Sequence, residues 1–286
     1  MRRVLLLLFF LVLMPLNALA AKVSAHKPLT PKPQYQLKTG IIYSTSQQAM
    51  DLYVPYKPHP AAVILVHGGG WAGGDRTQMN DYATLFASHG YLSANIDYRL
   101  APQSHYPDPV NDVRESVRFL QTHASAYGID PDKIVLLGVS AGGHLVLMTA
   151  LDQSGEHDAS PAIRPVHVAG VISIAGPTDL NPDQFAKNPD LQKNLQAFLN
   201  DARPDDVSPL TFVHSADTPS VFLMHGDADT IVPVDQTLRM AAALKAIGAP
   251  VRVIIYPGAG HEIIIPTRDR SAIFSALLDF VAKLDQ

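Results

Sequence analysis

The sequence predicts an α/β fold in which a mostly parallel sheet is covered by helices on both faces. Strand-like and helix-like segments alternate along most of the chain, and several strand-like segments, such as Ala61–Val66, are continuously apolar. Continuous apolar strands are typical of parallel sheets buried on both faces. The chain has 286 residues and no cysteine, so packing alone must hold a core of substantial size.

The first twenty residues have the layout of a secretory signal peptide. Arg2 and Arg3 precede an apolar run at residues 4–14, and small residues precede a cut after Ala20. The alternative is an uncleaved anchor, because residues 4–21 reach the lower limit of about 17 residues for a membrane span. We expect cleavage and export, either to the periplasm or out of the cell, with no membrane span in the mature chain.

Residues 21–40 are rich in proline, lysine, serine and threonine and predict an extended leader before a domain at residues 41–286. Met50–Val54 alternates apolar and polar residues and predicts a strand. Ala61–Val66 and Leu92–Ile96 predict buried strands. Between these two, Met79–Gly90 predicts a helix that is closed by a glycine.

The second half of the domain continues the alternation. Pro109–Tyr127 carries an apolar stripe and is followed by Gly128 as a C-terminal cap, so it predicts one long helix. The other expected strands are Ile134–Leu137, Val168–Ile174, Val221–Met224 and Val251–Tyr256. The other expected helices are Gly143–Leu151, Asp235–Ile247 and Arg268–Lys283.

One segment, residues 176–220, interrupts this alternation. It contains six prolines and a short helix-like piece near Leu191–Leu199. A connection of this length is usually functional or flexible, whereas most connections have only a handful of residues. We interpret it as a small cap over the edge of the sheet, and an inert surface excursion is the alternative.

The motif Gly138-Val139-Ser140-Ala141-Gly142 joins a predicted strand to a predicted helix. In such a sharp turn, side chains at Gly138 and Gly142 would collide with the backbone, and the serine oxygen projects at the sheet edge as a nucleophile. A Gly-x-Ser-x-Gly motif alone is common, so other residues must support this interpretation. His144 follows one helical turn later, and we expect it to pack or form hydrogen bonds because it would approach the serine from below.

An activated serine needs a base and a group that orients the base. His261 lies in a glycine-containing loop after the last predicted strand, and Asp229 follows the strand before it. The resulting chain order of serine, aspartate and histidine is the order expected when successive strand ends supply nucleophile, acid and base. Asp227 and Asp179 are alternatives for the acid.

The segment His67-Gly68-Gly69-Gly70-Trp71 directly follows a predicted buried strand. Consecutive glycines allow backbone amides to turn into a cleft, so Gly69 and Gly70 are candidate oxyanion donors together with the amide of Ala141. A phosphate-binding loop is disfavoured because no Lys-Ser/Thr pair follows and the Walker spacing is absent.

Four motifs together resemble the α/β-hydrolase superfamily and, within it, the branch of feruloyl-esterase-like, acetyl-xylan-esterase-like and hormone-sensitive-lipase-like carboxylesterases. They are His67-Gly68-Gly69-Gly70-Trp71, Asp97-Tyr98-Arg99-Leu100-Ala101-Pro102, Gly138-Val139-Ser140-Ala141-Gly142-Gly143-His144-Leu145 and His225-Gly226-x-x-Asp229. The resemblance implies an eight-stranded, mostly parallel sheet, a triad of Ser140, Asp229 and His261, oxyanion donors at Gly69, Gly70 and Ala141, and no cofactor or metal.

The same resemblance implies a structural role for Asp97, Tyr98 and Arg99, which would buttress the glycine loop. Val139 stands where lipase-like members usually have aspartate, and this difference favours the feruloyl-esterase-like side. No sizeable cap helix precedes the first strands, so a lipase-like lid does not define the acyl pocket.

From these residues we expect a serine hydrolase that cleaves a carboxylic ester with a short or aromatic acyl group through an acyl-enzyme. An arylformamidase-like amide hydrolase is the first alternative, and an inactive hydrolase-like binding protein is the second. The formal charge is −4 and there are no long runs of lysine and arginine, which disfavours nucleic acid as a partner and leaves a small-molecule ester.

Overall fold

The computed structural model describes residues 34–153, 165–215, 218–262 and 270–286, which belong to one compact unit. The predicted signal peptide at residues 1–20 and the first part of the predicted leader lie outside the described residues. Within the described ranges, no helix combines the length and the apolar composition that crossing a membrane requires.

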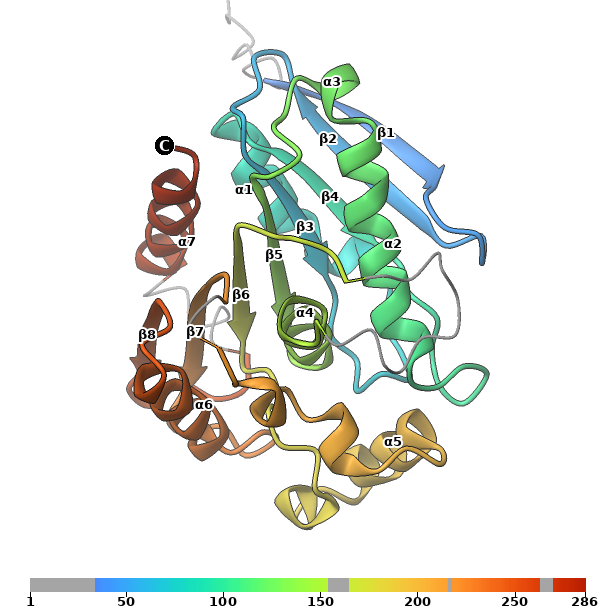
Figure 1. Cartoon of the computed structure of the whole chain (residues 1–286), viewed down its shortest axis with the longest axis vertical. Coiled ribbons are helices and arrows are strands. Elements are labelled where there is room, and N and C mark those ends of the chain that lie inside the picture. Colours follow the sequence, from blue (N-terminus) through green and yellow to red (C-terminus); the bar gives the residue numbers. More distant parts are fainter. Residues whose placement is uncertain (1–33, 154–164, 216–217, 263–269) are drawn as a thin grey trace, which may run out of the picture. The chain divides into compact units, whose positions relative to one another are not determined.

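An eight-stranded sheet forms the centre of this unit (Figure 1). The order of the strands is β1-β2-β4-β3-β5-β6-β7-β8; β1 and β2 are antiparallel to their neighbours, and the pairs from β4 to β8 are parallel. The prediction of a mostly parallel, eight-stranded sheet is therefore confirmed. The strands are β1 Tyr35–Ile42, β2 Ala49–Pro55, β3 Ala62–Val66, β4 Leu92–Ile96, β5 Ile134–Val139, β6 Gly170–Ile174, β7 Ser220–Gly226 and β8 Val251–Tyr256.

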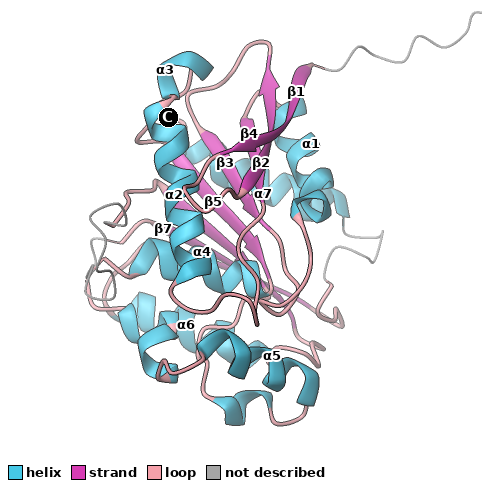
Figure 2. Cartoon of the chain, turned by 90° about the vertical axis from the view of Figure 1, so that its right-hand side faces the viewer, coloured by secondary structure: helices cyan, strands magenta, loops and turns pink. Residues whose placement is uncertain are grey.

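Helices cover both faces of the sheet, as Figures 1 and 2 show. Because side chains alternate along a strand, Ala62, Ile64 and Val66 of β3 join the core cluster under α2, α4 and α6, whereas Val63 and Leu65 join the cluster under α1 and α7. The helices are α1 Asn80–Ser88, α2 Asp108–Thr122, α3 Ala124–Tyr127, α4 Ala141–Leu151, α5 Pro189–Leu199, α6 Val234–Ala246 and α7 Arg270–Leu284. A short 3₁₀ helix, η1 Arg76–Met79, leads into α1.

The sheet begins earlier than the sequence suggested. Residues 35–40 of the predicted leader belong to β1, which pairs with β2 from Tyr35 opposite Pro55 to Ile42 opposite Ala49. This edge strand is mostly exposed or half-buried and therefore lacks the continuous apolar run that marks an inner strand. The sheet therefore begins within the segment predicted as leader, before the predicted domain boundary at residue 41.

The predicted single helix Pro109–Tyr127 is two helices. α2 ends at Thr122, and the backbone of His123 leaves the helical region at φ −101° and ψ 10° before α3 begins. The His123 ring folds back, with Nδ1 at 2.8 Å from the carbonyl oxygen of Phe119, which also accepts the backbone amide of His123 at 3.1 Å. Gly128, at φ 69°, closes α3 as the predicted cap.

The long connection after β6 carries α5 and three short 3₁₀ helices. These are η3 Pro182–Phe185, η4 Pro204–Val207 and η5 Pro209–Phe212. In Figure 1, α5 lies beyond the carboxyl ends of the parallel strands, which is the edge where α/β folds bind ligands. We refer to residues 176–215 as the insertion.

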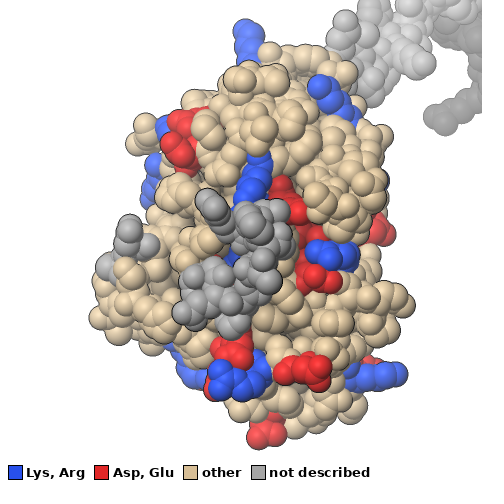
Figure 3. All heavy atoms as spheres, turned by 45° about the vertical axis from the view of Figure 1, so that its right-hand side comes forward, with Lys and Arg blue, Asp and Glu red and all other residues tan. Residues whose placement is uncertain are grey.

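Charged side chains of both signs are interspersed on the face shown in Figure 3. Charges of opposite sign also pair with one another in the described residues; Arg99, for example, lies 3.0 Å from Asp108 and 2.8 Å from the buried Asp112. The described residues of that face form no broad field of one sign, so electrostatic attraction of a highly charged partner to it is weak.

Candidate active site

Ser140 lies in a sharp turn between β5 and α4. Its backbone has φ 54° and ψ −120°, a region that residues other than glycine rarely adopt. The turn is tight enough that a Cβ on Gly138 would lie 2.1 Å from the carbonyl oxygen of Gly142, and a Cβ on Gly142 would lie 2.2 Å from that of Val66. Only glycine fits at these two positions, as the sequence predicts.

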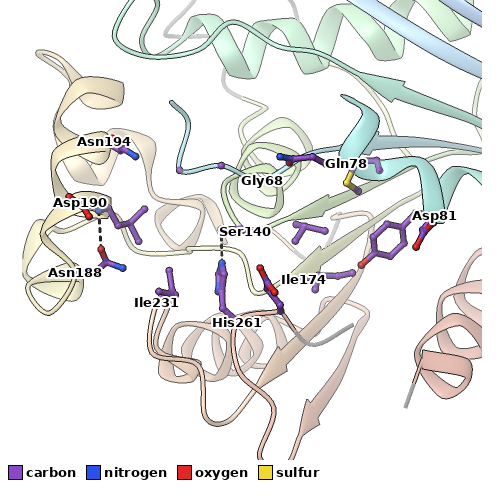
Figure 4. Close-up of a pocket in the computed structure, with 17 residues that line it drawn as sticks. Gly68, Gln78, Asp81, Ser140, Ile174, Asn188, Asp190, Asn194, Ile231 and His261 are labelled. Carbon is purple, nitrogen blue, oxygen red and sulfur yellow. Dashed lines mark hydrogen bonds between the residues drawn. The ribbon is translucent and has the colours of Figure 1, made fainter. Parts of the chain in front are cut away.

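Ser140, His261 and Asp229 form one hydrogen-bonded chain. His261 Nε2 lies 2.9 Å from Ser140 Oγ, and His261 Nδ1 lies 2.7 Å from Asp229 Oδ2 (Figure 4 shows the first contact). The three residues follow β5, β7 and β8, so adjacent ends of parallel strands bring them together. In this arrangement Ser140 Oγ–H donates to His261, and His261 Nδ1–H donates to the carboxylate.

Asp229 accepts hydrogen bonds at both carboxylate oxygens. Oδ1 accepts from the backbone amides of Ile231 and Val232 at 2.8 and 2.9 Å, and Oδ2 lies 3.0 Å from His225 Nε2 as well as close to His261. Burial alone would raise the pKa of Asp229, but the hydrogen bonds from the two histidines outweigh burial and hold the pKa well below its ordinary value. The carboxylate is therefore ionised at neutral pH.

His225 is a fully buried histidine whose orientation is fixed at both ring nitrogens. Nε2 faces two acceptors, Asp229 Oδ2 and the carbonyl oxygen of Val232 at 2.9 Å, so it must carry the hydrogen. Nδ1 is then the acceptor for the Thr237 hydroxyl at 2.7 Å. His225 thereby links the Asp229 carboxylate to helix α6.

The two alternative acids have other partners. Asp227 Oδ1 accepts from the amide of Gly258 at 2.6 Å, and Asp179 binds Arg239 at 2.8 Å. In the part of the chain that the structure describes, neither carboxylate forms a hydrogen bond with His261.

The glycine loop after β3 faces Ser140. Gly69 has φ 114° and Gly70 has φ 57°, and their amides donate to none of the acceptors within the described ranges. The amide of Ala141 is at the first position of α4, where no acceptor within the helix exists. Three amides of the predicted set are thus available for a ligand.

Tyr98 supports this loop from behind, as the resemblance implied. Its ring stacks on His67 with 4.3 Å between centroids, and its hydroxyl donates to the carbonyl oxygen of His67 at 3.2 Å. His67 Nδ1 in turn lies 2.7 Å from the carbonyl oxygen of Gly68.

His144 packs inside the molecule, as expected, and makes two hydrogen bonds there. Its Nε2 donates to the carbonyl oxygen of Val207 at 2.8 Å, and its Nδ1 accepts from the indole N–H of Trp71 at 3.1 Å. Burial lowers the pKa of His144 to about 4 and also lowers the pKa of His67. Both rings are neutral at neutral pH.

These two histidines should make stability depend on pH. Their pKa values are lower in the folded than in the unfolded chain, so their contribution is complete above pH 6.5 and is lost as the pH falls below it. His144 alone should reduce the free energy of unfolding by about 2 kcal/mol between pH 7.5 and 5. Asp229 does not contribute in this window, because stabilisation from a carboxylate of lowered pKa is lost only below about pH 4.

Urea unfolding at several pH values measures this dependence. In His144→Gln the free energy of unfolding should depend less steeply on pH, because the contribution of His144 is removed and that of His67 stays. Thr149→Val is the matched control, because Thr149 is a buried polar residue of the same helix that does not titrate. A slope in His144→Gln equal to that of the wild type would contradict the assignment.

A cavity of about 730 Å³ opens above Ser140 and His261 (Figure 4). Its two opposite walls come from the insertion and from the segment around the start of α1. The polar or charged residues of these walls are Asn188, Asp190 and Asn194 on one side and Gln78, Asp81 and Tyr82 on the other. The volume suits a ligand of metabolite size. Within the described ranges, no group of three or more histidine or acidic side chains is arranged to bind a metal ion.

Comparison with known proteins identifies the family. The profile of the BD-FAE family matches residues 50–244, more than half of the chain. The chain belongs to the BD-FAE family. This result agrees with the resemblance to α/β-hydrolase esterases that the sequence motifs indicated.

This BD-FAE member resembles several proteins with esterase names. It is 30% identical to the esterase LipC of Mycobacterium tuberculosis over 80% of this chain and 60% of LipC. It is 26% identical to the isoprenylcysteine alpha-carbonyl methylesterase ICME of Arabidopsis thaliana over 79% of this chain and 56% of that protein. The chain thus spans three fifths or less of the length of these two relatives.

Solved structures share the fold of this BD-FAE member. A truncated carbohydrate esterase from gut microbiota superposes with a TM-score of 0.77 at 22% identity, covering 89% of this chain and 98% of that one. The esterase Est2 of Thermogutta terrifontis with propionate bound superposes with a TM-score of 0.72 at 25% identity, covering 88% and 95%.

Two features of the site in this BD-FAE member are not predicted from its sequence: the role of His225 and the cavity residues of α5. His225 was noted only as part of a motif, although its place four residues before Asp229 is a signal for contact with that loop. The cavity residues of α5 carry no local signal, because amides and carboxylates on a helix surface are common wherever the helix faces solvent.

Proposed function

We propose that this protein is a serine hydrolase that cleaves a carboxylic ester through an acyl-enzyme intermediate. Ser140 is the proposed nucleophile, His261 the general base and acid, and Asp229 the residue that orients the base. The observation that carries the proposal is the hydrogen-bonded chain of these three side chains at the base of a cavity faced by unused backbone amides. The esterase names of the relatives support the same reaction class.

In the first half of the reaction, His261 Nε2 removes the proton from Ser140 Oγ as the oxygen attacks the ester carbonyl. The carbonyl oxygen becomes negative, and the amides of Gly69, Gly70 and Ala141 would stabilise it. The ionised Asp229 stabilises the imidazolium and keeps Nδ1 protonated. When the tetrahedral intermediate collapses, the bond to the alcohol breaks, and His261 donates the proton to the leaving oxygen.

In the second half, a water molecule takes the place of the alcohol. His261 Nε2 removes a proton from this water, the resulting nucleophile attacks the acyl carbon, and the same amides stabilise the second oxyanion. Collapse breaks the bond to Ser140 Oγ, which receives the proton from His261. The products are a carboxylic acid and the free enzyme, and no cofactor takes part in any step.

The proposed substrate is a neutral ester with a short or aromatic acyl group. The cavity wall contains Asp190 and Glu262 in addition to Asp81, which is paired with Arg270, and the described lining residues include no lysine or arginine, which disfavours an anionic substrate. Est2 of Thermogutta terrifontis was solved with propionate, a short acyl group, and this supports a short acyl specificity here.

The test combines a reactive probe with a substrate panel. A fluorophosphonate should label the wild-type protein on the peptide that contains Ser140, and p-nitrophenyl acetate should be turned over at a rate that the probe abolishes. The panel compares p-nitrophenyl esters of increasing chain length, methyl ferulate, acetylated xylan and N-formylkynurenine. Turnover of N-formylkynurenine alone would favour the formamidase alternative, and absence of both labelling and turnover would favour a binding protein.

A further inference from the structure

Trp71 is the residue that follows the proposed oxyanion donors, and it is anchored on two sides. Its indole N–H donates to His144 Nδ1 at 3.1 Å, and its ring stacks on Phe198 of α5 with 5.1 Å between centroids and 15° between planes. The side chain is fully buried although the backbone has φ 59°, a left-handed conformation that is unfavourable for a bulky residue. Such a conformation persists only when surrounding contacts hold it.

His144 connects Trp71 to two other parts of the site. Its own amide donates to the carbonyl oxygen of Ser140 at 3.1 Å, so the ring lies on the first turn of α4, next to the elbow. Its Nε2 donates to the carbonyl oxygen of Val207 in the insertion at 2.8 Å. The neutral ring, whose pKa burial lowers, can serve as acceptor for Trp71 and donor for Val207 at the same time.

The insertion also packs directly on the glycine loop. A Cβ placed on Gly70 would lie 3.1 Å from Asn194 Nδ2 and 3.4 Å from Leu191 Cδ1, both on α5. In Figure 4, Asn194 projects from the insertion toward this loop. The loop is therefore confined between the insertion and the elbow helix α4.

We propose that Trp71 and His144 are positioning residues that hold the Gly69 and Gly70 amides in place by joining the glycine loop to α4 and to the insertion. We call this set of contacts, with Phe198 and the carbonyl of Val207, the bracket. The inference rests on the proposed function, because it assigns these amides to the oxyanion. If the inference holds, the insertion affects catalysis through the bracket, besides lining the cavity.

Loosening the bracket should reduce catalysis more than substrate binding. The amides contact a charge that is absent from the bound substrate and develops only as the tetrahedral intermediate forms, so their displacement lowers kcat and leaves KM nearly unchanged. Loss of one oxyanion donor costs about 10²–10³ in kcat. Because loosening displaces the amides without removing them, we expect a loss of about tenfold to a hundredfold.

The experiment measures three variants of the full chain. Trp71→Phe keeps a ring next to Phe198 and removes the indole donor, His144→Leu removes both hydrogen bonds, and Phe198→Leu loosens the bracket from the insertion. Each variant is titrated with a fluorophosphonate, so that kcat refers to folded, reactive sites only. Inhibition by a trifluoromethyl ketone, which forms an oxyanion on Ser140, is compared with inhibition by the carboxylate product, which does not.

We expect catalysis and binding of the ketone to weaken together. In each variant, kcat per titrated site should fall and the inhibition constant of the ketone should rise by a similar factor, while KM and inhibition by the product stay within about twofold of the wild type. A residue that only stabilises the fold would lower the number of titrated sites without changing these ratios. Thr149→Val, a buried change on the same helix, is the control and should match the wild type.

The emission of Trp71 adds an independent readout, because it is the only tryptophan in the chain. His144→Leu and Phe198→Leu should shift this emission, and Thr149→Val should not. If Ser140-dependent turnover is present and all three bracket variants keep the kcat and ketone inhibition of the wild type, the bracket proposal is wrong and the proposed function stands. If the wild type shows no Ser140-dependent turnover, the proposed function fails.

Discussion

Replacing Asp229 with asparagine should lower kcat by about 10⁴-fold while the fold is retained. The reason lies in four N–H donors that converge on this side chain: the amides of Ile231 and Val232 at Oδ1, and His225 and His261 at Oδ2. An asparagine has one oxygen, and the two backbone amides would retain it. Its amide group would then face His261 and favour the tautomer that carries the proton on Nε2, which cannot accept a proton from Ser140.

Steady-state kinetics with p-nitrophenyl acetate, corrected for titrated sites, measures this loss. Asp227→Asn and Asp179→Asn are the matched controls, since these residues were the alternatives for the acid and bind Gly258 and Arg239 instead. Both controls should keep kcat within a few-fold of the wild type. A loss of the expected size in Asp227→Asn and a near-normal Asp229→Asn would reverse the assignment.

The sequence could predict the members of the candidate site because each follows a strand. Parallel strands end at the same edge of the sheet, so chemistry-bearing residues after Val66, Val139, Gly226 and Tyr256 converge when the sheet forms. The glycines of the elbow added a second constraint, because they are required only where the backbone turns sharply. These signals come from residues that are close together in the chain, so a single sequence is enough to detect them.

The support around the site could not be predicted in the same way. Contact between His144 and Val207 joins residues 63 positions apart, and the stacking of Trp71 on Phe198 depends on how the insertion folds back. No periodicity or motif encodes such a contact. His225 is an intermediate case, since its spacing from Asp229 is local but its donor and acceptor assignment depends on Thr237 of α6.

The errors in the fold have a similar origin. β1 was assigned to the leader because an exposed edge strand needs few apolar residues, and its pairing with β2 is what defines it. At His123 the backbone leaves the helical region although Leu120 before it and Ala124 after it are both buried, so the apolar pattern gives no sign of the break. In both cases the hydrophobic pattern leaves the boundary undefined, and for β1 the pairing with β2 defines it.

Gly142→Ala should strongly destabilise the fold. The new Cβ would lie 2.2 Å from the carbonyl oxygen of Val66 and 2.5 Å from that of His67, both backbone atoms at the end of the central strand β3. Neither atom can move without disturbing the pairing of β3 with β4 and β5. We expect the free energy of unfolding to fall by about 3 kcal/mol, at the upper end of the range for overpacked sites.

Urea unfolding followed by circular dichroism measures this change, and Gly248→Ala is the control. Gly248 differs from Gly142 in having a positive φ, 74°, and a Cβ there would meet no atom within 4 Å, so only the backbone preference opposes the alanine. That preference costs about 1 kcal/mol. Gly142 has no positive φ, so a loss in Gly142→Ala comes from the close contacts, whereas the loss in Gly248→Ala comes from the backbone alone. Equal destabilisation would mean that β3 and α4 move apart easily, and the close approach would then not be what holds Ser140 in its strained conformation.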